Sequence, residues 1–443
     1  MDSGPTLTPV KRPGGILRRA LGNAGLLLGG KAGGALMQLA ALALAAHGLG
    51  VVEFGYFSML LALVQLLAGL AAFQSSSATV RYGVHHVESG NVGAFQSLIK
   101  AGTLLDVSAA AAATLATIVL APAIGRHLAW EPRIVTAAQW IAPLAFANAI
   151  ATSRGMLRLF GRFDLLARQL LVTPAARLAG IAVAFAAGAS LPGYLMAWLV
   201  AGLLGAAVGA WFAWREAGRR DLLAGISGSL KGLSRENEGI WKFMMITNLN
   251  SSVGLIPGHL STFLVGAMLG PAEAGLFKVA REVGAALARP VDLLNQSVYP
   301  DIARLVVSRE WARLKRTIFR AGLIATVVSG AATLLMLAVG HLLIAAVFGA
   351  EFLPGLPVLI LISVATTLSV SVFAAEPMMN ALGRPGGPLI TSLIANLAFL
   401  ALLLWRLPRD GLIGAGWAYV AAAAITTVLS CALGWATWKA ARS

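Results

Sequence analysis

The stretch LFKVAREVGAALARPVDLLNQSVY, from Leu276 to Tyr299, determines how the rest of this chain is interpreted. It is long enough to cross a bilayer as a helix, at about 1.5 Å of rise per residue. Its polar residues fall within an arc of about 100° on one side of that helix. They are Lys278, Arg281, Glu282, Arg289, Asp292 and Gln296. A charge facing lipid at the bilayer centre costs about 3 kcal/mol or more, so we expect this face to border a water-filled cavity or another helix.

The composition of the chain also indicates a membrane protein. The chain has 443 residues, of which 58% are hydrophobic and 12% charged, whereas soluble domains carry about 25% charged residues. We therefore predict an all-α polytopic membrane protein. The net charge of +16 does not indicate nucleic acid, because membrane proteins accumulate Lys and Arg in cytoplasmic loops. The single cysteine, Cys431, excludes an internal disulfide and a cysteine-based metal cluster, and we expect no cofactor and no metal.

With about 20 apolar residues per crossing, the sequence predicts twelve membrane-spanning helices. Their approximate limits are 21–46, 56–76, 101–124, 135–153, 167–188, 192–213, 243–268, 276–298, 318–340, 355–378, 387–405 and 412–437. Lys and Arg concentrate in alternate loops, starting with the N-terminal segment, which predicts that both termini are cytoplasmic. The opposite loops hold only Arg126, Arg133, Arg406 and Arg409. Asp301 to Lys315 reads as an amphipathic surface helix.

The chain resembles itself at an offset of 220 residues. The motif L-G-x-x-x-x-G-x-F occurs at Leu49 to Phe57 and again at Leu269 to Phe277, and Gly161-Arg162 matches Gly383-Arg384 at nearly the same offset. We therefore predict two six-helix bundles, residues 1–225 and 226–443. An even number of spans per repeat gives both halves the same orientation, so a pseudo-two-fold axis along the membrane normal is expected. In parallel-repeat transporters of this kind, the substrate path lies between the halves.

Polar residues within the predicted spans are the candidates for lining that path. The predicted anion-binding residues are Arg289, Arg281, Lys31, Lys278 and Arg177. Uncharged groups expected in the cavity are Asn248, His259, Gln38, Gln65 and Gln296. The acids in the spans are Asp292, Glu282, Asp106 and Glu376, and they are candidates for coupling transport to a cation.

Structural alternatives exist for these candidates. An acid at helical spacing neutralises a base, as Arg281 with Glu282 or Arg289 with Asp292. Lys278 lies near the predicted outer interface, which a lysine side chain reaches by snorkelling. His259 fits a hydrogen-bonded contact between helices as well as a proton relay. These pairings and the coupling role stay open on sequence grounds.

The balance of charge favours an anion. Bases outnumber acids within the predicted spans, and Lys31 and Arg289 lie near the predicted centre. Phosphate or diphosphate suits such a path, because an arginine guanidinium binds its oxygens in a forked geometry. A pathway for an organic cation is expected to show the reverse balance.

These features resemble the Wzx-type polysaccharide-unit flippases of the MATE-like superfamily of multidrug, oligosaccharide-lipid and polysaccharide exporters. The resemblance rests on the two six-span halves, the repeated glycine motif, the Tyr299-Pro300 pair and the two Gly-Arg loops. The chain is also similar, more distantly, to the flippases of lipid-linked peptidoglycan precursors. Those relatives carry cationic residues in the first and eighth spans, where Lys31 and Arg281 lie here, and they usually have two further spans.

The resemblance implies that the chain moves an undecaprenyl-diphosphate-linked oligosaccharide across the bacterial inner membrane by alternating access. Its implied partners are that lipid-linked glycan, membrane lipid, and a polysaccharide polymerase with its chain-length machinery. One alternative is a cation-coupled multidrug exporter of the same fold, which the positive path argues against. A membrane-embedded polymerase or ligase is the other, but the predicted outer loops lack the substantial carboxylate- or histidine-bearing segment that such an enzyme needs.

Overall fold

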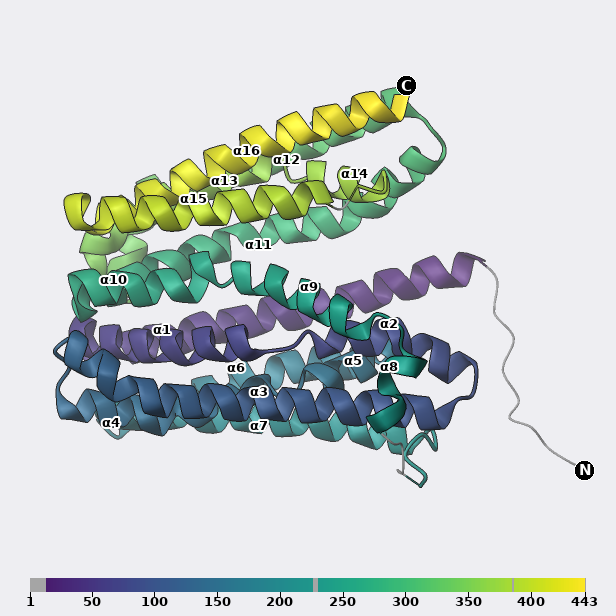
Figure 1. The fold of residues 1–443 in the computed structure, drawn as a ribbon. Helices are drawn as coiled ribbons and strands as arrows, with labels where there is room; N and C mark the ends of the chain where they lie inside the picture. Colours follow the sequence, from purple (N-terminus) through teal and green to yellow (C-terminus); the bar gives the residue numbers. More distant parts are fainter. Residues whose placement is uncertain (1–12, 226–229, 385, 443) are drawn as a thin grey trace, which may run out of the picture.

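The structure is a computed structural model that describes residues 13–225, 230–384 and 386–442. Within these ranges, side chains are not described at 13–24, 26–28, 231, 287–297, 299–300, 303 and 442. Every described element is a helix. Figure 1 shows two groups of helices that lie close together at one end and diverge toward the end where α1 begins and α16 finishes.

The N-terminal helix group consists of α1 to α7. Its elements are α1 Pro13–Ala71, α2 Ser75–Glu88, α3 Val92–His127, α4 Pro132–Ile141, η1 Ala142–Asn148, α5 Ala151–Leu159, α6 Phe163–Ala186 and α7 Leu191–Gly218. Small residues bring α1 and α6 together: a Cβ added at Gly30 or Gly34 would lie 3.0 Å from a backbone oxygen of α6. This close approach is typical of helix packing in membranes.

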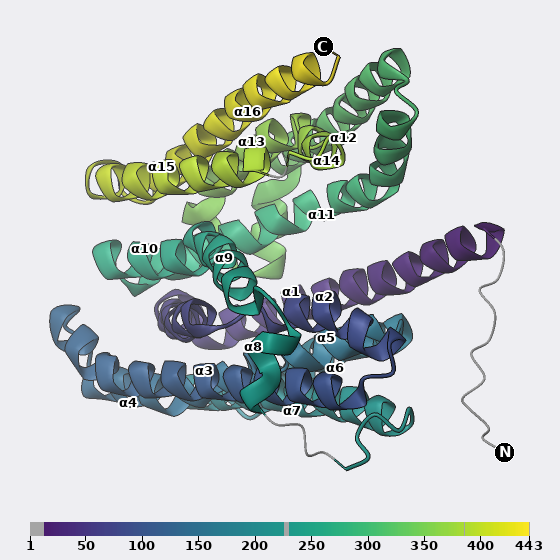
Figure 2. The same cartoon turned by 45° about the vertical axis from the view of Figure 1, so that its right-hand side comes forward.

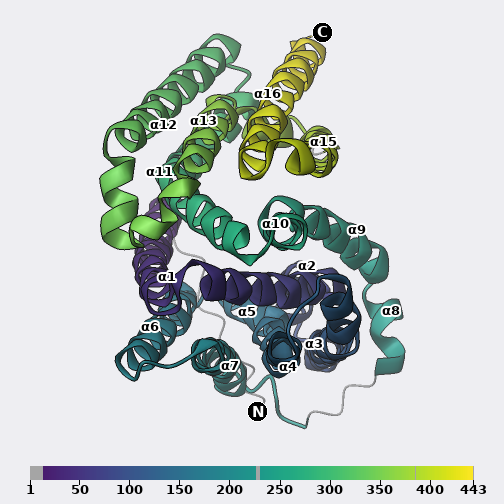
Figure 3. The same cartoon turned by 90° about the vertical axis from the view of Figure 1, so that its left-hand side faces the viewer.

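The C-terminal helix group follows a short connection made by η2 Leu230–Gly232 and α8 Leu233–Glu236. Its elements are α9 Ile240–Val253, η3 Ile256–Leu260, α10 Ser261–Leu269, α11 Pro271–Val307, α12 Trp311–Val347, η4 Ala350–Gly355, α13 Leu356–Ser371, α14 Ala375–Ala381, α15 Gly386–Asp410 and α16 Leu412–Arg442. Figure 2 shows α8 beside α3 and α9 leading back toward α10. Figure 3 places α11 next to α1, so these two helices face each other across the groups.

The repeated glycine motif forms equivalent turns in the two groups. Gly50 bends α1 with φ 69° and ψ 173°, and Gly270 separates α10 from α11 with φ 108° and ψ 169°. A positive φ favours glycine, because a Cβ would clash there. The motif phenylalanines, Phe57 and Phe277, are both fully buried.

Other turns with positive φ recur along the two halves at nearly the same spacing. Besides Gly50 and Gly270, the pairs are Gly90 with Arg309, Ala129 with Gly349, Gly161 with Gly383, and Gly188 with Gly411. Helix ends therefore follow one pattern in both halves of the chain, which supports the internal repeat predicted from sequence. The proposed division near residue 225 borders residues 226–229, which lie outside the described part.

The all-helical membrane fold is confirmed. Among the described residues, ten helical stretches are long and apolar enough to cross a membrane. One of them, Gly29–Glu88, has 60 residues and is bent at Gly50. The 37-residue α11 is not among the ten, which are drawn from the described residues, and residues 287–297, 299–300 and 303 of α11 lie outside them. The count of twelve spans stays a prediction.

The predicted surface helix from Asp301 to Lys315 is wrong. Residues up to Val307 belong to α11, and α12 begins at Trp311. The chain turns between them, with Arg309 at φ 56°, so no single amphipathic helix forms. Trp311 packs against Trp438 with ring centroids 5.7 Å apart.

Candidate functional site

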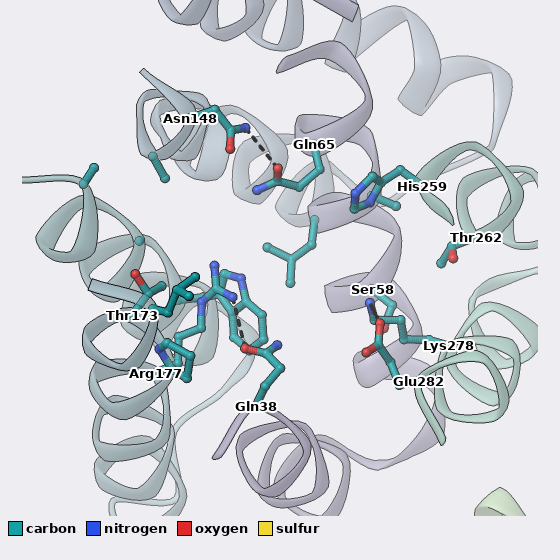
Figure 4. A pocket seen from close by; sticks show the side chains of 18 of the residues that line it. Gln38, Ser58, Gln65, Asn148, Thr173, Arg177, His259, Thr262, Lys278 and Glu282 are labelled. Atoms are coloured by element: carbon teal, nitrogen blue, oxygen red, sulfur yellow. Dashed lines mark hydrogen bonds and ion pairs between the residues drawn. The ribbon is translucent and has the colours of Figure 1, made fainter. Parts of the chain in front are cut away.

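A cavity of about 550 Å³ lies between the two helix groups. One wall comes from α1, η1, α5, α6 and α7, and the other from η3, α10 and α11. Figure 4 shows Arg177 and Gln38 on one side of it, with Lys278 and Glu282 on the other. The charged stripe of α11 thus faces a cavity, as predicted for the part of it whose side chains are described.

Arg177 is held from two directions. Its Nη1 donates to Gln38 Oε1 at 3.1 Å, and its guanidinium carbon lies 4.2 Å from the ring centroid of Trp198. These contacts join α6 to α1 and α7. The Nε of Arg177 is buried and has no hydrogen-bond partner among the described residues. Because the guanidinium has five N–H donors, the Gln38 contact leaves donors for an anion in the cavity.

The α11 wall gathers two bases on one carboxylate. Lys278 Nζ lies 2.8 Å from Glu282 Oε1, and Arg281 Nη2 lies 3.1 Å from the same oxygen. The three side chains are 15%, 17% and 20% exposed for Lys278, Arg281 and Glu282. Sharing one carboxylate between two cations leaves an excess of positive charge at this wall.

Uncharged polar side chains line the remaining surface. Asn148 Nδ2 donates to Gln65 Oε1 at 3.1 Å, which joins η1 to α1, and Figure 4 shows this pair near His259. His259 lies in η3, a single π-helical turn, and Thr262 follows in α10. Thr262 Oγ1 donates to the Gly258 carbonyl at 3.1 Å. Gln38, Gln65 and His259 are among the residues that line this cavity.

Arg154 also lines the cavity, and sequence reasoning missed it. The predicted fourth span ends at 153, which leaves Arg154 in the loop that follows it. The structure continues that region as α5, from Ala151 to Leu159. Within the described part of the lining there are four bases, Arg154, Arg177, Lys278 and Arg281, against one acid, Glu282.

Two predicted cavity residues lie elsewhere. Lys31 is exposed on α1 and does not line the cavity. Gly30 and Gly34 share the face of α1 that packs on α6, which turns Lys31 to another face. Asn248 lies in α9, also outside the lining, and its Oδ1 is buried with no hydrogen-bond partner among the described residues.

Asp106 and Glu376 do not line this cavity. Asp106 is 5% exposed and its Oδ2 accepts a hydrogen bond from the Thr152 N–H at 2.7 Å. Thr152 is the second residue of α5, so Asp106 caps that helix from α3. Glu376 is exposed and lines a different cavity in the C-terminal helix group. The side chains of Arg289, Asp292 and Gln296 lie outside the described residues.

The described lining of the cavity is rich in positively charged and polar groups. Guanidinium and ammonium groups converge on it from both helix groups, and amide and hydroxyl groups fill the space between them. Its volume falls in the range of small-molecule sites, about 300–1,000 Å³. The bases thus lie on helices of both groups.

Comparison with known proteins agrees with this fold. Residues 20–306 match the family described as polysaccharide biosynthesis protein. The chain belongs to this family. It is also 31% identical over 341 residues to the inner membrane protein YghQ of Escherichia coli (strain K12), which covers 76% of this chain and 95% of that protein. The predicted resemblance is therefore confirmed at the level of the family.

Solved structures share the fold at low identity. A structure of the lipid II flippase MurJ in an inward closed conformation has a TM-score of 0.71 and 14% identity, covering 90% of this chain and 85% of that one. An inward-facing multidrug resistance MATE family transporter of the MOP superfamily gives 0.68 and 16%, covering 93% and 95%. A MOP superfamily transporter from Pyrococcus furiosus, described by the reverse polarity of its binding pocket, gives 0.62 and 16%, covering 95% and 96%. At these identities the structures show that the chain shares their fold.

Proposed function

We propose that this chain translocates an oligosaccharide linked to undecaprenyl diphosphate across the bacterial inner membrane for surface polysaccharide biosynthesis. The observation that carries the proposal is the cavity lining, where four described bases face one acid. A diphosphate carries several negative charges, and Arg side chains bind its oxygens through paired N–H donors. The hydrated part of the cavity then accommodates the sugars, and the polyprenyl chain stays in lipid.

Family membership and the relatives support this substrate class. The family is named for polysaccharide biosynthesis, MurJ is described as a lipid II flippase, and YghQ as an inner membrane protein. Alternating access fits the two helix groups, because substrate bound to Arg177 on α6 and Lys278 on α11 couples their relative movement. A polysaccharide polymerase and chain-length machinery are the expected partners downstream.

A cation-coupled multidrug exporter is the second candidate, since multidrug transporters share the fold. The sign of the cavity opposes an organic cation as its substrate. Positive charge attracts anions and repels cations. Glu282, the acid of the described lining, is already shared by Lys278 and Arg281.

Export in a flippase-deficient strain tests the proposal. The wild-type chain is expected to restore surface glycan, and Arg177→Gln and Lys278→Gln are expected to reduce it strongly at equal protein abundance. Arg313→Gln is the matched control, because Arg313 is exposed and pairs with Glu310 outside the cavity. Normal export by both cavity variants at wild-type abundance would remove the main support for the anion cavity.

A further inference from the structure

A second cavity, of about 540 Å³, lies inside the C-terminal helix group. Its walls come from η3, α11, α13, α14, α15 and α16. Its lining is mostly apolar, but uncharged hydroxyl and amide side chains lie within it, where the first cavity has bases. Those on which the argument depends are Thr366, Thr391, Ser392, Asn396 and Thr426. The function proposed above does not use this space.

Arg281 connects the two cavities. Its side chain contributes to the lining of both. Nη2 of Arg281 faces Glu282, while its Nε is buried without a hydrogen-bond partner among the described residues. A phosphate held by Arg281 in the first cavity therefore lies next to a residue that also lines the second.

Thr391 shows that the second cavity suits a polar ligand. The residue is 3% exposed, and its Oγ1 has no hydrogen-bond partner among the described residues. Buried hydroxyls in proteins are normally hydrogen-bonded, since leaving one unpaired is unfavourable. A ligand with hydroxyl groups satisfies Thr391, whereas a hydrocarbon chain does not.

Other groups of the lining keep free acceptor capacity. Thr366 and Thr426 donate to carbonyls of their own helices, Ile362 and Ala422, each at 2.9 Å. Asn396 Nδ2 donates to the Ser392 carbonyl at 2.8 Å. Each hydroxyl oxygen still has lone pairs to accept from a ligand, and the Asn396 amide oxygen is an additional acceptor.

An aromatic pair and one carboxylate complete the site. Phe399 and Tyr419 meet edge to face with centroids 4.6 Å apart, and both line the cavity. Glu376, also in the lining, is exposed. A pyranose ring has an apolar face that packs on aromatic carbon. Its hydroxyl groups donate to acceptors such as a carboxylate, and small-molecule sites commonly combine aromatic and polar groups in this way. The carboxylate also disfavours a second anion here, which leaves the diphosphate with the bases of the first cavity.

We infer that the second cavity binds the sugar units nearest the diphosphate, so that Arg281 marks the boundary between a phosphate subsite and a glycan subsite. This inference rests on the proposed function, because it requires a substrate in which sugar is bonded directly to phosphate. It assigns glycan selectivity to α13, α15 and α16, away from the bases that hold the phosphate. The polyprenyl chain is the competing occupant, and the test separates the two.

Native mass spectrometry on the purified full chain provides the test. The two probes are undecaprenyl diphosphate alone and the undecaprenyl-diphosphate-linked glycans extracted from the bacterium that carries this gene. The wild type is expected to bind the glycan-bearing lipids about tenfold more tightly than the bare lipid. Thr391→Val and Asn396→Leu are expected to remove most of that preference and to leave affinity for bare undecaprenyl diphosphate unchanged.

Controls distinguish failure of this inference from failure of the proposed function. Thr427→Val changes a neighbouring hydroxyl on α16 that bonds the Leu368 carbonyl outside the cavity, and it is expected to keep the preference. Arg177→Gln is expected to weaken both probes. Equal weakening of both probes by Thr391→Val, with Thr427→Val unaffected, would assign the cavity to the polyprenyl chain and overturn the inference. No glycan preference in the wild type, or an unchanged preference in Thr391→Val and Asn396→Leu, would also overturn it, whereas no binding of either probe by the wild type would overturn the proposed function itself.

Discussion

At the scale of single residues, Arg177 shows how one buried base is both positioned and kept available. Gln38 takes one of its donors and Trp198 covers its face. A guanidinium is well suited to this, because it is planar, stacks on aromatic rings and still has donors to spare. The contacts restrict its rotamers before substrate arrives, which lowers the entropy lost on binding.

Two substitutions of Arg177 distinguish the contribution of its charge to phosphate binding from that of its forked guanidinium geometry. Arg177→Gln removes the charge, and affinity for undecaprenyl diphosphate is expected to fall about 10- to 100-fold, the effect of losing a charge-assisted hydrogen bond of about 1.5–3 kcal/mol. Arg177→Lys keeps the charge and loses the fork, so a smaller decrease is expected. Binding to protein in nanodiscs measures both. Equal affinities for wild type and both variants would show that Arg177 does not contact the phosphate.

Asp106 is expected to act on stability. Its carboxylate caps α5 through the Thr152 N–H, and losing such a cap costs about 1 kcal/mol. Asp106→Ala, which removes the acceptor, should therefore lower the melting temperature of the purified protein, with glycan export falling only as folded protein falls. Asp410→Ala is the control, because Asp410 forms a partly exposed pair with Arg406 that contributes little. Lost export at unchanged stability would instead support the predicted coupling role.

Sequence predicts which residues share a face of one helix, but it does not predict which face packs on another helix. Periodicity correctly grouped Lys278, Arg281 and Glu282 on one face, since an α-helix fixes that relation. It could not place Lys31, because the face of α1 that packs on α6 is decided by Gly30 and Gly34 meeting another helix. Arg154 was missed for a related reason: loop and helix end differ by a few residues, and only packing decides between them.

At the scale of elements, α1 and α11 are joined by reciprocal close contacts. A Cβ added at Gly55 would overlap the carbonyl of Pro271, and one added at Gly275 would lie 2.8 Å from the carbonyl of Val51. The repeat pairs Gly55 with Gly275 and Val51 with Pro271, so each half presents the same elements to the other. Self-complementary contacts of this kind are typical of a two-fold relation.

Opening this contact should change access to the cavity. In Gly55→Ala the new methyl group overlaps Pro271 and forces the two helices apart at that end. A cysteine placed at Ser58, which lines the cavity, in a Cys431→Ser background is expected to react several-fold faster with a membrane-impermeant thiol reagent applied from that side. Gly330→Ala is the matched control, because nothing lies within 4 Å of the added Cβ. An unchanged labelling rate in Gly55→Ala would mean that the contact does not gate access.

The position of a turn could be predicted from sequence where its backbone conformation favours one residue type. The Leu-Gly motifs predicted equivalent turns, and Gly50 and Gly270 both adopt the positive φ that favours glycine. The turn at Arg309 has no such signal, because an arginine takes a positive φ there. Charge periodicity across Asp301 to Lys315 consequently suggested one helix. Within this stretch α11 ends and α12 begins.

At the scale of the whole molecule, the recurrent turns and the reciprocal glycine contact support a pseudo-two-fold axis between the halves. The charges do not follow that symmetry. Lys278, Arg281 and Glu282 of α11 correspond to Ser58 and uncharged residues of α1, and the N-terminal group instead contributes Arg154 and Arg177. Repeat symmetry thus predicted the framework, while the distribution of charge had to come from side-chain packing in three dimensions.

The charges of the loops predict how the molecule is oriented in the membrane. Lys and Arg bias in the loops predicts that both termini face the cytoplasm. Alkaline phosphatase fused at the turns of Gly188 or Gly411 is therefore expected to be active. The same enzyme fused at the C-terminus is expected to be inactive. A fluorescent reporter that matures only in the cytoplasm is expected to show the opposite pattern. In this orientation the Gly55–Gly275 contact closes the outer end, and the helix groups diverge toward the cytoplasm (Figure 1). The cationic cavity then belongs to a conformation that receives substrate from inside. Active phosphatase at the C-terminus would reverse this assignment, because the same closed contact would then separate the cavity from the cytoplasm and the described conformation would be the one that releases substrate.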